Sequence, residues 1–484
     1  MNKKPYTFRT LLKLVSLLSF VFIFSIQAQT QPNIILVIAD DLSWDDLGAY
    51  GHETVKTPNL DKMAEKGMKF DNAYLTASSC SPSRSSIITG RYPHNTDAEQ
   101  LHWALPAAQI TFSEKLQEVG YWTAAAGKWH LGDEVVDRFD VVHESRFGKD
   151  EPSGTDKWLG LLDERPKDKP FFLWLASWDA HRPFFEGEHP VKYAQEDVRM
   201  PPYYPATELY LNDFAAYYNE VSRLDYVVGQ IVKKLESQGI ADNTLIVFIA
   251  DNGRPYARDK ATLYDSGVKT PFIAYWPDGI SAGIVSKSII SSIDIAPTFL
   301  TLANAELPST LEGKTLTPLF KAPNTPFRKY AFSERNWHDF EDHGRSVRSE
   351  KYRYIRNNYN DLPATPSADT VYHKTWAELV RLNKQGALTN AQSRPFLAPR
   401  PKEELYDLTS DPYELNNLAS NKEYSNILME HSEALEQWIK QTNDFIPSFR
   451  THDDFDRETG AITKYRKRNP RPSKMEMYNA SGKY

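Results

Sequence analysis

Four short apolar runs, each followed at once by charged or hydrogen-bonding residues, constrain the fold of this 484-residue chain more than any other feature. The runs span residues 33–39, 121–126, 171–176 and 244–250. Their apolarity is continuous rather than alternating, as in strands that are buried on both faces of a parallel sheet. Ligands of such sheets bind beyond the carboxyl ends of the strands. We therefore expect residues that follow different runs, such as Asp40 and Asp251, to share one pocket.

Helical segments are predicted between the runs, at residues 58–67, 113–120 and 212–238. Because strands and helices alternate, the sequence predicts an α/β domain with a large mixed, mostly parallel sheet flanked by helices. We place this catalytic domain at residues 29–325.

The pattern changes after Pro326. Alternating polar and apolar residues at 351–355 predict a half-exposed strand, and a helix is predicted within 423–441. A smaller C-terminal α+β subdomain is therefore expected over residues 326–450. Residues 451–484 are expected to form a solvated basic tail, with an arm that grips a polyanion as the alternative.

Residues 1–28 have the features of a secretory signal peptide. Basic residues precede or open an apolar stretch at 14–26, and the small residue Ala28 follows it. The stretch is shorter than the ~20 residues that a bilayer span needs, so a retained membrane helix is the weaker alternative and no stable membrane span is expected. We predict a secreted or periplasmic protein. The formal charge of −7 argues against a general nucleic-acid binder.

The chain has a single cysteine, which excludes a disulfide framework and a cysteine-rich metal site. Pro82 suits the first turn of a helix with Ser81 as its cap, and Gly90 suits the end of that helix. Cys80 is then predicted at the positive, amide-bearing end, where Arg84 adds a charge that can bind an oxyanion. Taken alone, a buried structural cysteine is the plainer interpretation.

Cys80, Pro82 and Arg84 form a CxPxR pattern, which residues 88–91 extend as ITGR. With these residues the chain resembles the formylglycine-dependent sulfatases of the alkaline phosphatase superfamily, in which the cysteine is oxidised to formylglycine. Further matching segments follow in family order, and they lie at residues 32–34, 40–41, 127–132, 251–253 and 404–412. The resemblance implies an alkaline phosphatase-like fold, and it implies a partner that modifies Cys80, either a formylglycine-generating enzyme or an anaerobic sulfatase-maturating enzyme.

Three carboxylates and one amide oxygen from two strand ends form an all-oxygen site that suits Ca²⁺, with Mg²⁺ as the less suitable ion. The resemblance assigns one Ca²⁺ to Asp40, Asp41, Asp251 and Asn252, with an oxygen of the modified Cys80 as a further ligand. For the Asp40-Asp41 pair alone, a helix cap or a turn is the alternative.

The resemblance also assigns catalytic roles. Hydrated formylglycine at position 80 would attack sulfur, and His130 would take the proton whose loss restores the aldehyde. Arg84 and Lys128 would hold the diol and the developing charge, while His181 and Lys260 would serve the departing alcohol. Without the resemblance, a histidine after a strand is ordinarily a turn residue and a lysine is ordinarily at the surface.

Aromatic and charged residues near these motifs suit sugar rings that carry negative groups. The candidates for substrate binding are His102, Trp103, Arg254, His338 and Arg345, and core packing is the alternative for the tryptophan. Residues 251–256 are most similar to the sulfamidase-like branch. That branch's N-sulfate enzymes carry arginine where this chain has Lys260, which favours an O-sulfate ester.

The sequence therefore predicts an exported sulfatase for a sulfated polysaccharide or its oligosaccharides, with algal ulvan as an example and a glycosaminoglycan as its rival. Three alternatives stay open. They are a phosphodiesterase or phosphonate monoester hydrolase on the same fold, an N-sulfoglucosamine sulfohydrolase, and a sugar-binding protein without activity.

Overall fold

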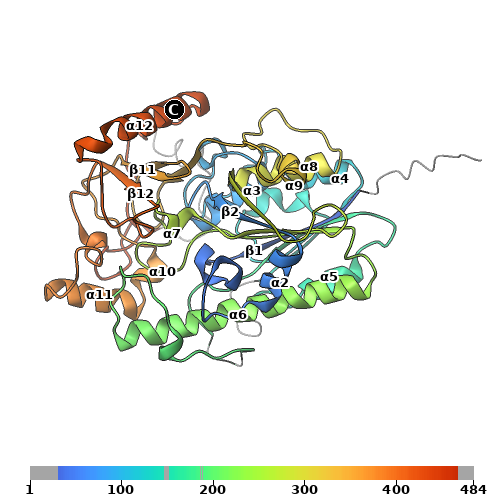
Figure 1. The fold of residues 1–484 in the computed structure, drawn as a ribbon, viewed down its shortest axis with the longest axis horizontal. Helices are drawn as coiled ribbons and strands as arrows, with labels where there is room; N and C mark the ends of the chain where they lie inside the picture. Colours follow the sequence, from blue (N-terminus) through green and yellow to red (C-terminus); the bar gives the residue numbers. More distant parts are fainter. Residues whose placement is uncertain (1–30, 146–151, 186, 188, 467–484) are drawn as a thin grey trace, which may run out of the picture. The chain divides into compact units, whose positions relative to one another are not determined.

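Two sheets carry the fold in the computed structural model, which describes residues 31–145, 152–185, 187 and 189–466 (Figure 1). Within these residues the larger sheet has eight strands in the order β4-β3-β5-β1-β6-β7-β2-β8. Its strands are β1 Asn33–Ala39, β2 Met68–Tyr74, β3 Trp122–Gly127, β4 Val141–Glu144, β5 Phe171–Ala176, β6 Thr244–Ala250, β7 Phe272–Tyr275 and β8 Ile284–Ser291. The four apolar runs form β1, β3, β5 and β6, so the predicted strands are confirmed.

The central strands of this sheet run parallel. β1 pairs in parallel with both β5 and β6, and β3 pairs in parallel with β5. β7 is antiparallel to its neighbours β6 and β2. The sheet is therefore mixed and mostly parallel, which confirms the predicted α/β class.

Helices cover both faces of the larger sheet (Figure 1). The α-helices of the described residues are α2 Pro58–Lys66, α3 Cys80–Thr89, α4 Phe112–Glu118, α5 Trp158–Glu164, α6 Glu208–Ser237, α7 Asp265–Val268, α8 Ile295–Leu302, α9 Thr317–Lys321, α10 Ala368–Val371, α11 Lys374–Lys384 and α12 Ser425–Thr442. Leu36 of β1 belongs to the apolar core beneath α3, α4 and α8, whereas Val37 belongs to the core beneath α2, α5 and α6. Burial of alternate residues on opposite faces explains the continuous apolarity of the strand.

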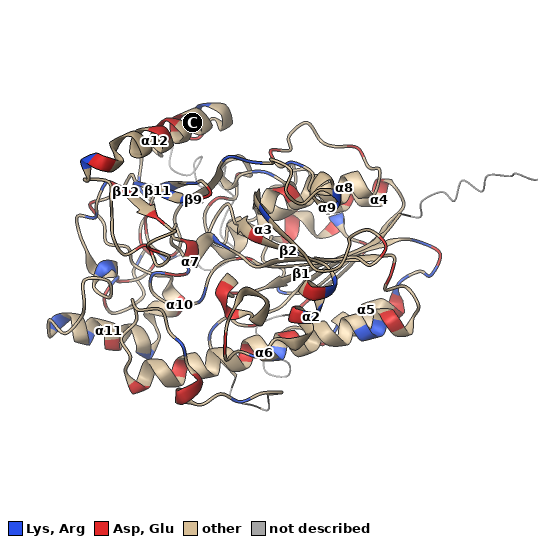
Figure 2. Cartoon of the chain, viewed as in Figure 1, with Lys and Arg blue, Asp and Glu red and all other residues tan. Residues whose placement is uncertain are grey.

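Acidic and basic side chains both occur along the outer helices α6 and α12 (Figure 2). One such pair, Lys234 with Asp163, joins α6 to α5 at 2.5 Å. These helices therefore carry charges of both signs rather than a patch of a single sign.

The smaller sheet is antiparallel, and its order in the described residues is β12-β11-β10-β9. Its strands are β9 Ala331–Arg335, β10 Gly344–Arg348, β11 Tyr352–Asn357 and β12 Glu403–Asp407, and α12 packs against β10 and β11. The predicted strand is confirmed as β11, but its predicted half-exposure is wrong, because Arg353 and Tyr354 are fully buried. The Arg353 guanidinium is paired with Asp265 of α7 and, at 2.9 Å, with Glu414.

The described residues from Pro32 onwards form one compact unit that contains both sheets. Part of the predicted tail is folded, since Asp454 and Phe455 are buried. The predicted signal peptide, residues 1–28, lies outside the described residues, and the boundaries at residues 325 and 450 stay predictions. No helix within the described ranges combines the length and the apolarity of a bilayer span.

Candidate active site

The polar residues that follow β1 and β6 meet at the carboxyl edge of the sheet. Ala39 and Ala250 are register partners at the ends of these two strands. The Asp41 amide therefore donates to Asp251 Oδ1 at 3.3 Å, and the Asn252 side-chain amide donates to Asp41 Oδ1 at 2.6 Å. The prediction that residues after these two runs share one place is confirmed.

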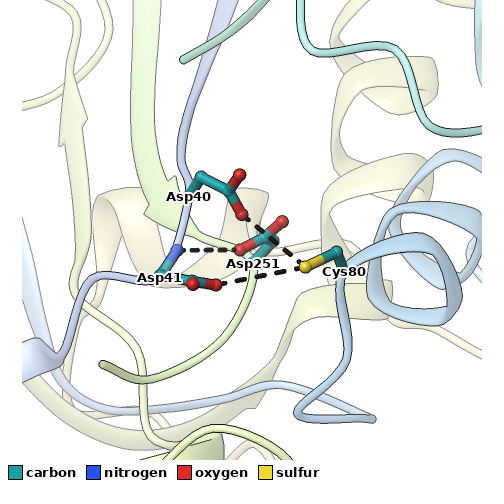
Figure 3. A group of neighbouring side chains, drawn as sticks. All are labelled: Asp40, Asp41, Cys80 and Asp251. Atoms are coloured by element: carbon teal, nitrogen blue, oxygen red, sulfur yellow. Dashed lines mark hydrogen bonds between the residues drawn. The ribbon is translucent and has the colours of Figure 1, made fainter. Parts of the chain in front are cut away.

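Cys80 is the first residue of α3 and points at these carboxylates (Figure 3). Its Sγ lies 3.7 Å from Asp40 Oδ1 and 4.0 Å from Asp41 Oδ1, and the residue is 2% exposed. The helix cap is Ser79 rather than the predicted Ser81, because the helix begins two residues before Pro82. Burial raises the pKa of the Cys80 thiol well above its ordinary value, although Lys128 and other nearby cations oppose the shift.

Each of the three carboxylates has its own basic partner. Lys128 Nζ donates to Asp40 Oδ2, Lys260 Nζ donates to Asp41 Oδ2 at 2.9 Å, and Arg84 Nε donates to Asp251 Oδ2 at 2.8 Å. All six side chains are nearly or fully buried. The outer carboxylate oxygens are thus engaged by cations, while the Oδ1 atoms of Asp40 and Asp41 face Cys80.

This donor set fits the Ca²⁺ that the family resemblance implies. Asp40, Asp41, Cys80 and Asp251 offer ligand atoms within 4.8 Å of one another. Among the described residues, Asn252 Oδ1 is buried and accepts no hydrogen bond. A buried amide oxygen without a donor is costly unless a further group meets it, and with the carboxylates it makes the hard oxygen set that Ca²⁺ takes.

Two histidines lie together beside Cys80 in the pocket wall. His102 Nδ1 and His130 Nε2 are 2.8 Å apart, and His130 Nδ1 is buried with no hydrogen-bond partner in the described part of the chain. Burial, and then the neighbouring His102 and Lys128, hold the pKa of His130 well below its ordinary value. A neutral imidazole of this kind can accept a proton.

A third histidine meets an acid that the sequence did not point to. Asp369, in α10, places Oδ2 2.8 Å from Lys260 Nζ and 3.3 Å from His181 Nε2. The two residues assigned to the departing alcohol are therefore joined through one carboxylate. Asp369 stands in no motif and follows no apolar run, so no signal in the sequence could have found it.

These groups line one pocket of about 430 Å³. The predicted residues in its wall are Cys80, His102, Lys128, His130, His181, Lys260 and His338. Arg84 lies behind the wall, where its Nη1 also donates to the Lys128 carbonyl at 3.0 Å. His338 is held by Ser79, whose Oγ lies 2.7 Å from His338 Nδ1.

Three of the predicted substrate-binding residues do not line this pocket. Trp103 is 2% exposed and packs in the core beneath α4. Arg254 is buried against Asp46, with Nε 2.8 Å from Oδ2. Arg345 is buried in a two-point ion pair with Asp444 at 2.6 and 2.7 Å. The structure thus gives these three side chains partners within the protein.

Comparison with known proteins gives the family. The Sulfatase family matches residues 32–305, and the family described as N-sulphoglucosamine sulphohydrolase, C-terminal, matches residues 256–366. An ulvan-active sulfatase of Formosa agariphila is 30% identical over 467 residues, which cover 86% of this chain and 76% of that protein. Human N-sulphoglucosamine sulphohydrolase is 29% identical over 461 residues, which cover 85% of this chain and 90% of that protein.

Solved structures share the fold. One, in complex with its substrate D-glucosamine-2-N,6-O-disulfate, has a TM-score of 0.68 at 23% identity and covers 86% of this chain and 99% of its own. Another, in complex with k-i-k-neocarrahexaose, has a TM-score of 0.63 at 23% identity. The match covers 84% of this chain and 93% of that one. The predicted resemblance is confirmed: this chain belongs to the sulfatase family, and it is a sulfuric ester hydrolase.

Proposed function

We propose that this protein is an exported enzyme that hydrolyses O-sulfate esters on sulfated polysaccharides or their oligosaccharides, with formylglycine at position 80 and one Ca²⁺. One observation carries the proposal: Cys80, which lines the pocket, lies against three converging carboxylates. Cationic and imidazole side chains line the same pocket, where a sulfate group would bind.

The relatives support a polysaccharide substrate. Two relatives are ulvan-active sulfatases of Formosa agariphila, and one structural neighbour is in complex with k-i-k-neocarrahexaose. The pocket wall also carries Trp178, which with Lys128 Nζ 4.7 Å from its ring centroid combines an aromatic face with positive charge. Such a combination suits a sugar ring that bears a sulfate.

Asp40, Asp41, Asp251 and Asn252 would hold the Ca²⁺, which when bound would offset negative charge and orient a sulfate oxygen. The protein's own groups would do the rest. One hydroxyl of the hydrated aldehyde at position 80 gives its proton to a neighbouring carboxylate, its oxygen attacks sulfur, and the bond from sulfur to the sugar oxygen breaks. His181 or Lys260 protonates the departing oxygen.

The second hydroxyl then releases the sulfate. It loses its proton to His130, its oxygen forms the aldehyde double bond, and the bond from carbon to the sulfated oxygen breaks. Sulfate leaves with the electron pair of that bond, and the aldehyde is ready for the next water. Lys128, which lines the same pocket as Cys80, would stabilise the developing charge.

An N-sulfoglucosamine sulfohydrolase is the second candidate, because residues 256–366 match the C-terminal family of that enzyme. Turnover of an aryl O-sulfate and of N-sulfoglucosamine separates the two, and we expect the O-sulfate to be the better substrate. An aryl phosphate diester tests the phosphodiesterase alternative. A preference of about 10⁴-fold for the aryl sulfate would support our proposal, and the opposite preference would reject it.

Peptide mass spectrometry of active protein tests the nucleophile. Residue 80 is expected to be lighter than cysteine by about 18 Da, the difference between CH₂SH and CHO. The matched control is the same sequence produced in a host without a maturation enzyme, which should fold but lack turnover. An unmodified thiol in fully active protein, or normal turnover by Cys80→Ala, would contradict the proposal.

A further inference from the structure

The described end of the chain folds against the pocket. We call residues 452–466 the C-terminal strap. The amide of Asp454 donates to the Asp339 carbonyl at 2.9 Å, and the amide of Thr463 donates to the Asp454 carbonyl at 2.8 Å. Phe455 is 3% exposed and packs edge-on against Tyr372, with their ring centroids 5.1 Å apart. The strap is therefore a built part of the pocket wall rather than a free tail.

Further contacts fix the turn of the strap. Arg457 Nη2 donates to the Glu341 carbonyl at 2.8 Å, and Arg457 also pairs with Asp453 at 2.7 Å. A Cβ at Gly460 would lie 3.2 Å from the Tyr372 ring, so the turn approaches that ring closely. These contacts determine where the last described residue, Arg466, lies.

Arg466 and Tyr372 form an exposed edge of the same pocket that contains Cys80. The Arg466 guanidinium lies 4.6 Å from the centroid of the Phe455 ring, and no acidic side chain of the described residues pairs with it. Tyr372 is 54% exposed. An open aromatic ring beside a cation without a carboxylate partner is a surface that suits an anionic sugar.

The acids of this pocket wall are Glu144, Asp339 and Asp369. Asp369 is engaged by Lys260, and Asp339 Oδ2 accepts the Ala368 amide at 2.9 Å. Burial raises the pKa of Asp339 to about 7, so part of its charge is lost near neutrality. Glu144, the last residue of β4, also lines the pocket.

We infer that Arg466 and Tyr372 form a binding subsite for a carboxylate or sulfate on the sugar unit next to the one that bears the scissile ester. The inference rests on the proposed function, since it takes the ester to lie at Cys80. Tyr372 would pack against the neighbouring ring, and Arg466 would donate two hydrogen bonds to its anionic group.

Binding without turnover tests the subsite. The protein is the full chain with Cys80→Ala, and the first ligand is a sulfated tetrasaccharide that contains uronic acids. The second ligand is the same tetrasaccharide with its carboxylates reduced to alcohols. Calorimetry at 0.15 M salt gives Kd for Cys80→Ala alone and with Arg466→Gln. The matched control is Lys464→Gln, an exposed cation of the same strap that does not line the pocket.

We expect Arg466→Gln to raise Kd about fivefold to tenfold for the first ligand, as loss of a charge-assisted hydrogen bond would. A smaller effect on the reduced ligand would identify a carboxylate as the anion. An equal effect on both ligands would identify a second sulfate. If Arg466→Gln changed Kd no more than Lys464→Gln does, for both ligands, the inference would be overturned.

Turnover of a small aryl sulfate by mature, unsubstituted protein is measured separately. Failure of that reaction would reject the proposed function while leaving the binding difference in place. Loss of the binding difference with normal aryl sulfate turnover would reject the subsite alone. Tyr372→Ala should also weaken the binding of both ligands. Unchanged affinity in that variant would count against the aromatic half of the subsite.

Discussion

At the scale of single residues, Asp369 connects the groups proposed to serve the departing alcohol. Although burial opposes its ionisation, Lys260 and His181 hold the pKa of Asp369 well below its ordinary value. The carboxylate therefore stays charged and keeps both side chains aimed at one point in the pocket. Because it contacts these two side chains, we propose that its role is to position them.

Asp369→Asn keeps the size of the side chain and removes its charge. We expect kcat on an aryl sulfate to fall roughly tenfold to a hundredfold, because misplacement of a catalytic group by about 1 Å has an effect of that size. Steady-state kinetics measure it. Asp361→Asn, at an exposed carboxylate paired with Arg450, is the control. Equal kcat in both variants would show that Asp369 positions nothing of importance.

Residues inside motifs could be predicted, and residues outside them could not. Asp40, Asp251 and Cys80 meet because strand ends and a helix start meet, and both follow from local sequence patterns. For Trp103, Arg254 and Arg345, the sequence predicts substrate binding only from residue type and from nearness to the motifs. In the structure these side chains do not line the pocket. A buried arginine is positioned by the acid that pairs with it, and that acid lies far away in the sequence.

At the scale of secondary structure elements, buried ion pairs attach the smaller sheet to its surroundings. Arg345 of β10 pairs with Asp444, which follows α12, and Arg353 of β11 pairs with Asp265 of α7. Alternation of polar and apolar residues predicted β11 correctly as a strand. It did not predict the burial of the polar face, because that depends on acids from other elements.

Arg345→Met should destabilise the fold by about 3 kcal/mol, because it leaves Asp444 buried without its partner. Urea unfolding measures the change, and Arg381→Met, in an exposed pair on α11, should change stability by about 0.5 kcal/mol or less. If instead Arg345→Met were as stable as this control and bound sulfated oligosaccharides poorly, a substrate-binding role would be restored.

This ion pair also predicts a dependence on pH. Arg345 holds the pKa of Asp444 at about 2, against burial, which opposes it. Since the carboxyl pKa is lower in the folded state, its stabilising contribution is present above pH ~4 and is lost as the pH falls towards 2. The difference in unfolding free energy between wild type and Arg345→Met should therefore shrink on acidification.

At the scale of the whole molecule, the site is assembled from segments more than 300 residues apart in sequence, from Asp40 to Asp369. Any ion held at this place therefore binds the folded chain and not the unfolded one. Ligand binding of that kind stabilises the fold, by about 2.7 kcal/mol at a concentration of one hundred times Kd.

Removal of calcium with a chelator should accordingly lower Tm by several degrees and abolish turnover of an aryl sulfate, and added Ca²⁺ should restore both. Calorimetry measures Tm, and the Tm of Asp251→Asn should rise less on addition of Ca²⁺ than the Tm of wild type. Asp456→Asn, in an exposed turn of the C-terminal strap, is the control and should respond fully. A Tm that does not depend on Ca²⁺ in wild type would speak against the site.

The burial of Cys80 also bears on when this residue could be modified, relative to folding. Cys80 is 2% exposed in a pocket of about 430 Å³, which leaves little of its side chain open to the active site of another protein. If a partner enzyme oxidises Cys80, as we propose, we expect it to act on the nascent polypeptide, during synthesis or export, before the strands close over that position. A molecule that folded first would then keep its thiol, so the yield of active enzyme would depend on the relative rates of maturation and folding.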